Sequence, residues 1–351
     1  MDIKEALLKA KTIGASDVHL SVGRPIMGRL DGKLTAIGDS MLMPKDTEAL
    51  IAPLLDEKQR KELSVKGEID LALSLEGVGR FRLNVFKSRG SYAAALRMLP
   101  FKIPAPQDLG LPQAVINMTN KKRGLVLVTG PTGSGKSTTL AALINEINRL
   151  YPVHIITLED PIEYLHRSQT GMVNQREIGL DTRSYADALR AVLRQDPDIV
   201  LLGEMRDLDT ISTAVTAAET GHLVFSTLHT IGAAATIDRI IDVFPPHQQE
   251  QIRIQLATVL ECVCSQQLLP MSGKEGGRCA AFEVMIPNAA IRNLIREGKT
   301  FQIPSMIQTN RKAGMILLDD CLAELHMKNK ITRETALNYA QDYAYLERKL
   351  V

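Results

Sequence analysis

The sequence predicts a two-domain protein, in which a small α+β domain precedes a larger α/β domain built on a parallel sheet. Three observations support this prediction. Residues 1–99 carry short strand and helix patterns, and a cluster of prolines follows them. From residue 113 onward, apolar strands alternate with helices, as a parallel sheet requires. One strand–turn–helix junction in this second part carries a glycine-rich pattern typical of phosphate binding.

The composition is that of an ordinary globular protein. The chain has 351 residues, enough for about two domains, and is 45% hydrophobic and 23% charged. Its formal net charge of +2 gives no bulk field that would favour nucleic acid or an anionic membrane. No apolar run reaches the roughly 18 residues of a membrane span, and the first residues do not resemble a signal peptide. The four cysteines show no C-x-x-C spacing, so we expect a cytoplasmic protein without a zinc ribbon or a disulfide framework.

The first domain, residues 1–99, mixes helices with antiparallel strands. Helices are predicted over 3–13 and 47–63, strands over 16–20, 69–75, 79–86 and 92–98, and a hairpin with a tight Asp31-Gly32 turn over 29–34. Three arginines, Arg80, Arg82 and Arg97, lie on or beside these strands, and the first two face the same side because they are two residues apart. A solvated strand face is the simple interpretation of these arginines, and a functional basic face is the other.

Residues 100–112 are predicted to form a semi-rigid linker. Pro100, Pro104, Pro106 and Pro112 crowd this stretch, and proline at that density joins neither a helix nor a strand ladder. The alternative is a long internal loop of a single domain. A hinge at this place would allow one domain to move against the other.

The second domain, residues 113–351, begins with the phosphate-binding pattern. The apolar run 125–128 reads as a buried strand, and Gly130, Gly135, Lys136 and Ser137 then match every fixed position of G-x-x-x-x-G-K-[ST]. Backbone N–H groups of such a loop, with the N-terminus of the following helix, form a positive concavity for a polyphosphate. We expect Lys136 to reach the β- and γ-phosphates and Ser137 to ligate Mg²⁺. The residues assigned to nucleotide binding are Thr132, Gly133, Ser134, Gly135, Lys136, Ser137 and Thr138.

An acidic segment follows the next predicted strand, which spans residues 153–158. Glu159, Asp160 and Glu163 place three carboxylates within five residues. One interpretation is a helix start, with Asp160 as the N-cap, Pro161 at the first helical position and Glu163 closing a capping box. The other interpretation is catalytic, because strand carboxyl ends in parallel sheets face the ligand.

Two further strands end in polar residues. The apolar strand 198–204 ends at Glu204, whose carboxylate is placed to ligate Mg²⁺ or to position the attacking water. The strand 221–230 carries Thr227 and His229 near its end, where a γ-phosphate would be sensed. A structural histidine is the alternative role for His229. The remaining elements predicted are helices over 185–194, 211–218, 236–243, 248–267, 290–295, 317–327 and 333–345, and a strand over 282–286.

Seven stretches together resemble the secretion ATPases of type II secretion systems and type IV pili. These stretches are residues 130–138, 157–163, 203–207 and 227–230, which are typical of the whole superfamily, and 16–20, 290–295 and 302–309, which are typical of its pilus-retraction members. Extension and secretion members carry an extra N-terminal domain and a four-cysteine metal motif. This sequence shows neither, which favours the retraction branch.

The resemblance implies a PAS-like N-terminal domain joined to a RecA-like ATPase domain with a C-terminal helical region. It implies a homohexamer that binds ATP and Mg²⁺ at the cytoplasmic face of the inner membrane, peripheral to it. The implied partners are an inner-membrane platform protein and, through it, the pilin filament, and nucleic acid is not among them. Arg82 and Arg97 match arginines that family members send toward the phosphates, within one chain or across a subunit boundary.

The expected activity is ATP hydrolysis coupled to retraction of type IV pili, which drives twitching motility. The catalytic residues assigned are Glu204, Glu163, His229, Arg82 and Arg97, and the metal ligands are Ser137 and Glu204. Glu163 and Glu204 divide the water-positioning and metal roles in an order that the sequence leaves open. The alternatives are an extension or secretion ATPase of the same superfamily, a RecA-like nucleic-acid translocase, and a subunit that binds ATP as a switch without hydrolysing it.

Overall fold

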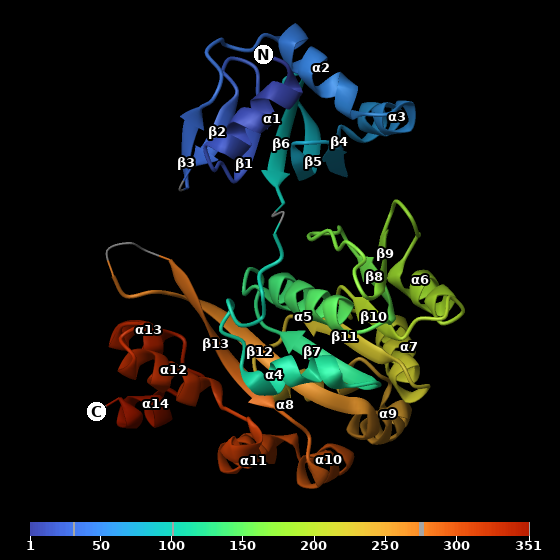
Figure 1. Cartoon of the computed structure of the whole chain (residues 1–351), viewed down its shortest axis with the longest axis vertical. Coiled ribbons are helices and arrows are strands. Elements are labelled where there is room, and N and C mark those ends of the chain that lie inside the picture. The colour runs from blue at the N-terminus through green and yellow to red at the C-terminus, as the bar shows by residue number, and fades with distance from the viewer. Residues whose placement is uncertain (31, 100–101, 274–276, 351) are drawn as a thin grey trace. The chain divides into compact units, whose positions relative to one another are not determined.

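The computed structural model describes residues 1–30, 32–99, 102–273 and 277–350, and the chain divides into two compact units (Figure 1). Residues Met1–Lys102 with Pro161–Leu165 form the N-terminal unit, and Ile103–Asp160 with His166–Val351 form the C-terminal unit. Asp31 of the predicted tight turn, and Pro100 and Phe101 of the predicted linker, lie outside the described residues.

The N-terminal unit is a six-stranded antiparallel sheet with helices on one face, a PAS-like arrangement. Its sheet order is β3-β2-β1-β6-β5-β4. Its elements are α1 (Ile3–Thr12), β1 (Asp17–Leu20), β2 (Met27–Leu30), β3 (Lys33–Ala36), α2 (Pro44–Ile51), η1 (Ala52–Leu54), α3 (Glu57–Lys66), β4 (Glu68–Leu75), β5 (Gly79–Ser88) and β6 (Ser91–Met98). Alternate strand residues such as Val18 and Leu83 are buried in one core with Leu7 of α1, so the other face of the sheet carries the polar side chains.

The single helix predicted over 47–63 is wrong, because two helices and a 3-10 turn occupy this stretch. Pro53 lies in the turn and has no N–H to continue α2. Asp56 then caps α3 by accepting a hydrogen bond of 2.8 Å from the backbone N–H of Gln59. The apolar residues keep a helical spacing across this break, so the pattern alone did not reveal it. Pro53 and the Asp56 cap determine where the break lies.

The C-terminal unit is a seven-stranded, mostly parallel sheet in the order β13-β12-β7-β11-β10-β8-β9. Its strands are β7 (Gly124–Thr129), β8 (His154–Glu159), β9 (Met172–Glu177), β10 (Ile199–Leu202), β11 (Leu223–Leu228), β12 (Leu260–Pro270) and β13 (Arg278–Met285). Among the described strands of this sheet, β13 alone runs antiparallel to its neighbour. Helices lie on both faces of this sheet (Figure 1), the RecA-like arrangement in which strand ends meet a ligand.

The helices of this unit are α4 (Gln113–Ile116), η2 (Asn117–Asn120), α5 (Lys136–Leu150), α6 (Tyr185–Val192), α7 (Leu208–Glu219), α8 (Ala233–Asp242), α9 (Pro246–Val259), α10 (Ala289–Arg296), η3 (Thr300–Gln302), α11 (Ile303–Thr309), η4 (Arg311–Ala313), α12 (Leu318–Met327), α13 (Arg333–Asn338) and α14 (Tyr343–Lys349). Apolar residues of α5 pack on one face of the sheet, and those of α7, α8 and α9 pack on the other. Among the helices in the described ranges, none is both long and apolar enough to cross a bilayer.

Two predictions for this unit are wrong. The helix predicted over 248–267 ends at Val259, and the chain continues as β12, which pairs in parallel with β7. The helix predicted over 333–345 is split into α13 and α14, because the Asp319 carboxylate accepts hydrogen bonds from the backbone N–H groups of Gln341 and Asp342. The edge strand β9 was not predicted. In each case a partner distant in sequence decides the local structure.

Candidate nucleotide-binding site

The predicted phosphate loop lies between β7 and α5, at the carboxyl end of a central parallel strand. Strand β7 is buried along its whole length between β11 and β12. The Lys136 side chain is largely buried, and its ammonium donates hydrogen bonds to the carbonyls of Gly130 at 2.8 Å and Pro131 at 3.0 Å. Ser137 lies exposed in the first turn of α5. The loop carbonyls therefore hold the Lys136 ammonium, and the N-terminus of α5 is open to solvent.

Two glycines of the loop make room for a neighbouring strand. A Cβ on Gly130 would lie 2.1 Å from the backbone oxygen of Gln266, and a Cβ on Gly135 would lie 2.8 Å from the Gln266 side-chain nitrogen. Both glycines also have positive φ. A Cβ on Gly133, by contrast, would meet nothing within 4 Å. Gly130 and Gly135 are therefore required by close packing against β12, besides the approach of a ligand that the sequence indicated.

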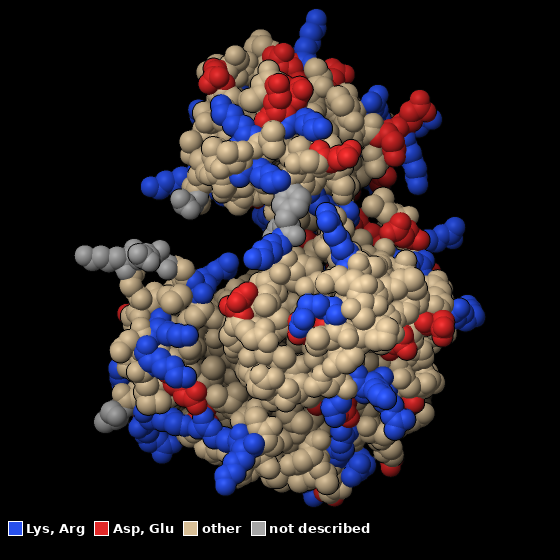
Figure 2. Space-filling view, viewed as in Figure 1, with Lys and Arg blue, Asp and Glu red and all other residues tan. Residues whose placement is uncertain are grey.

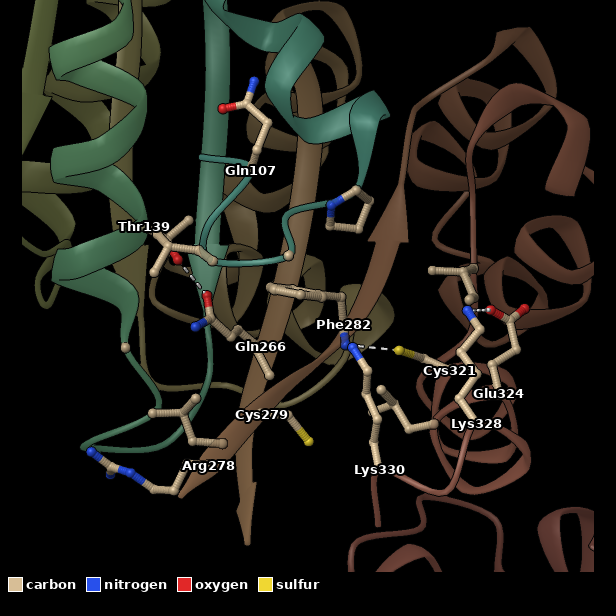
Figure 3. Close-up of a pocket in the computed structure, with 18 of the residues that line it drawn as sticks. Gln107, Thr139, Gln266, Arg278, Cys279, Phe282, Cys321, Glu324, Lys328 and Lys330 are labelled. Carbon is tan, nitrogen blue, oxygen red and sulfur yellow. Dashed lines mark hydrogen bonds and ion pairs between the residues drawn. The ribbon is translucent and has the colours of Figure 1, made fainter. Parts of the chain in front are cut away.

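A cavity of about 760 Å³ opens beside the loop (Figure 3). Gly135, Thr138 and Thr139 form the part nearest the loop, and Gln266 of β12 and Phe282 of β13 line it further on. Residues of the segment 107–112 and of the region around α12 complete the wall. Because Gly135 belongs to the phosphate loop, the cavity adjoins the loop.

Glu204 and His229 lie together at the carboxyl edge of the same sheet. Strands β8, β10 and β11 are parallel neighbours, so their ends line one edge. The Glu204 carboxylate pairs through one oxygen with the Arg206 guanidinium at 2.5 Å and through the other with His229 Nε2 at 3.3 Å. The Thr227 hydroxyl donates a 2.6 Å hydrogen bond to the Gly203 carbonyl, which joins the two strand ends.

The acidic segment after β8 does not begin a helix, so the capping interpretation of Asp160 is wrong. Glu159 accepts hydrogen bonds from the Thr157 hydroxyl at 2.6 Å and from Gln175 of β9 at 3.0 Å, which indicates a structural role. Glu163 lies in the segment Pro161–Leu165, which belongs to the N-terminal unit. A shared role of Glu163 and Glu204 therefore stays a prediction.

Tyr185, at the start of α6, is a site residue that sequence reasoning missed. A Cβ on Gly203 would lie 2.7 Å from the Tyr185 hydroxyl, so the phenol touches the backbone just before Glu204. Burial, followed by the charges of Asp160 and Glu204, raises the pKa of Tyr185, and the phenol keeps its proton at neutral pH. Gln266 was missed as well, and Arg206, within the stretch 203–207 that the resemblance used, was given no role of its own. Arg206 follows Glu204 closely, and Gln266 lies within a short polar stretch, Ser265 to Gln267, between apolar residues, but Tyr185 carries no signal in the sequence.

Arg82 and Arg97 face each other on the open side of the N-terminal sheet. They occupy directly paired positions of β5 and β6. Arg97 Nε donates a 2.9 Å hydrogen bond to Asp17 of β1, and Arg82 is exposed. Burial opposes ionisation of Asp17, but hydrogen bonds from Ser16 and Arg97 outweigh it and lower the pKa of this carboxyl. Two facing arginines repel each other. Asp17 offsets this repulsion at Arg97, and a role of the two arginines at the phosphates stays a prediction.

No cluster of three or more histidine, cysteine or acidic side chains that could hold a metal occurs within the described part of the chain. The four cysteines are free, and burial raises the pKa of Cys262 to about 12 and that of Cys321 to about 11. Lys and Arg side chains are interspersed with Asp and Glu on the visible surface of the C-terminal unit (Figure 2).

Comparison with known proteins places the chain in a family. The family model of the type II/IV secretion system protein matches residues 63–336. The type IV pilus retraction ATPase PilT of Pseudomonas aeruginosa is 49% identical over 97% of this chain and 98% of its own length. A twitching motility protein of Neisseria gonorrhoeae is 45% identical over 90% of this chain and 84% of its own. The crystal structure of the pilus retraction motor PilT with bound ADP has a TM-score of 0.94, 50% identity and 99% coverage of both chains. This chain belongs to the type II/IV secretion system protein family.

Proposed function

We propose that this chain is an ATPase that powers retraction of type IV pili. The observation that carries the proposal is the phosphate loop on β7, with the Glu204–His229 pair at the same sheet edge, in a chain that resembles a retraction ATPase along nearly its whole length. Assembly as a homohexamer on an inner-membrane platform protein, at its cytoplasmic face, is part of the same proposal.

The phosphates bind at the backbone amides of Thr132, Gly133, Ser134, Gly135, Lys136, Ser137 and Thr138. Lys136 leaves the Gly130 and Pro131 carbonyls and pairs with the phosphates. The Ser134 hydroxyl is buried and has no hydrogen-bond partner among the described residues, so it is available to a phosphate oxygen. The base and ribose occupy the cavity beside the loop, whose wall combines Phe282 with polar Gln266.

The residues present fit a Mg²⁺ ion. Ser137 is exposed in the first turn of α5, and the two oxygens of Glu204 contact Arg206 and His229, side chains that a metal ion would displace. Hydroxyl and carboxylate oxygens are the ligands that Mg²⁺ prefers. Bound there, Mg²⁺ neutralises charge on the phosphates.

Hydrolysis proceeds by attack of a water molecule, oriented by Glu204 or Glu163, on the γ-phosphorus of ATP, and His229 is hydrogen-bonded to Glu204. The bond between the γ-phosphorus and the bridging oxygen breaks, so that ADP and inorganic phosphate leave. Arg82 and Arg97 move to the phosphates when the N-terminal unit closes, within one chain or across a subunit boundary. An arginine delivered in this way contributes about 10³ to 10⁵ in rate. Closure thereby couples hydrolysis to movement of the pilus.

Two experiments test the proposal. The purified chain should release phosphate from ATP with Mg²⁺ and should form a hexamer. A strain without this chain should carry excess surface pili and show no twitching. Loss of pili in that strain would contradict retraction and favour extension, and absence of phosphate release would contradict the ATPase.

A further inference from the structure

Gln266 of β12 lies buried beneath the phosphate loop, 127 residues away in sequence from one of its partners. Its side-chain oxygen accepts a 2.7 Å hydrogen bond from the Thr139 hydroxyl of α5 (Figure 3). Its side-chain nitrogen donates a 2.7 Å hydrogen bond to the carbonyl of Ser134 in the loop. One amide thus joins the loop to the helix that follows it.

The backbone around Gln266 fits the loop closely. Strand β12 pairs with β7 as far as Ser265 opposite Thr129, so Gln266 and Gly130 come next on the two strands. Because Gly130 has no side chain, the backbone oxygen of Gln266 can approach it. Because Gly135 has none, the side-chain nitrogen of Gln266 can approach that residue. Four loop and helix positions, Gly130, Ser134, Gly135 and Thr139, therefore meet this one residue.

We propose that Gln266 is a positioning residue for nucleotide binding. It holds the phosphate loop in the nucleotide-binding conformation before the nucleotide binds. The inference rests on the proposed ATPase function. A loop that is already ordered loses less conformational entropy when it binds a polyphosphate. The two hydrogen bonds are buried, where a broken bond leaves a polar group unsatisfied.

The effect should appear in affinity more than in turnover. Gln266 touches the loop backbone and Thr139, while Glu204 lies just beyond the end of β10, in contact with His229 that follows β11. Gln266→Leu should therefore raise Kd for ADP and KM for ATP about tenfold, with kcat within about threefold of the parent. Gln267→Leu is the matched control, because Gln267 is also buried on β12 but does not line the cavity.

The experiment measures Kd for ADP and for inorganic tripolyphosphate, together with kcat and KM, in the parent and both variants. Equal losses of affinity for the two ligands in Gln266→Leu, with the Gln267→Leu values near the parent, would support the inference. Parent-like affinity in Gln266→Leu would overturn it. A loss confined to ADP would overturn it as well, because Gln266 would then act on the base. If the parent itself binds neither ligand, the proposed function fails instead.

A second pair of variants decides the matter should Gln266→Leu fold poorly. Thr139→Val removes the hydroxyl that Gln266 accepts from, whereas Thr139→Ser keeps it. Thr139→Val should weaken tripolyphosphate binding by about threefold to fivefold, and Thr139→Ser should stay nearer to the parent. Equal affinities in these two variants would overturn the inference.

Discussion

The phosphate loop and the acidic edge of the same sheet are held by different kinds of interaction. Neutral hydrogen bonds of buried groups brace the loop through Gln266. Glu204 at the edge is held by Arg206 and His229, whose side chains are 74% and 51% exposed. The Glu204 carboxylate is 14% exposed, but both partner side chains reach it from the solvent side, where such contacts contribute little to stability and rearrange readily. The difference indicates that the loop is set before nucleotide binds, while the edge rearranges, so affinity and turnover should respond to different residues.

The largest effect is expected on the loop side. Lys136→Ala removes the cation that pairs with the phosphates, and kcat/KM for ATP should fall by about 10³ or more. Nucleotide binding, measured by titration with a fluorescent ADP, should fall with it. Lys122→Ala, at an exposed position, is the matched control. If Lys136→Ala kept the parent affinity for ADP, the loop would not determine nucleotide affinity, and the distinction between loop and edge would be wrong.

On the edge side, Glu204→Gln should reduce kcat by about 10² while Kd for ADP stays within about threefold of the parent. The amide keeps the shape of the side chain but is a poor base and a poor cation ligand. The same measurements of kcat and Kd on Glu163→Gln show which of the two carboxylates contributes more to turnover. Parent rates of phosphate release in both variants would rule out the two-carboxylate scheme.

Acid should destabilise the fold through His166, which lies between β8 and β9. Burial lowers the pKa of His166 from 6.5 to about 4, and its Nδ1 is buried without a partner among the described residues. Between these values the unfolded chain binds more protons than the folded one, so stability falls as pH falls. The free energy of unfolding should drop by about 2 kcal/mol between pH 7 and pH 5.

His166→Asn should remove this pH dependence, and His247→Asn, at a more open position, should leave it unchanged. Denaturant midpoints at the two pH values measure the effect. An equal slope with pH in the parent and in His166→Asn would show that the imidazole is not responsible.

The smallest effect is expected for the phenol beside Gly203. Tyr185→Phe keeps the ring packed but removes the hydroxyl near Glu204, and kcat should fall about threefold to tenfold with KM unchanged. Tyr151→Phe is the control, because its hydroxyl binds Asn120 away from the edge. A change in KM for ATP without a change in kcat would show that Tyr185 affects nucleotide affinity, as the loop residues do, and would contradict its assignment to the edge.

Much of this site could be predicted from the sequence, because its signals are local. The loop has fixed spacing, and Glu204 and His229 follow directly on apolar strands, so their meeting at one edge follows from parallel topology. The open sheet face with Arg82 and Arg97 likewise follows from strand alternation.

What the sequence could not predict depends on partners distant along the chain. Residues 260–267 were predicted to continue a helix, and only pairing with β7 makes them the strand that carries Gln266. Tyr185 reaches Gly203 through the packing of α6, which no spacing encodes. Asp160 and Pro161 look like a helix start, but no helix begins there.

One measurement tests the central claim most directly: titration of Glu204→Gln and Lys136→Ala with ADP, alongside their rates of phosphate release from ATP. The account predicts that Glu204→Gln binds like the parent but turns over about 10² more slowly, whereas Lys136→Ala loses binding. Equal loss of binding in both variants would contradict it, and so would parent turnover in Glu204→Gln.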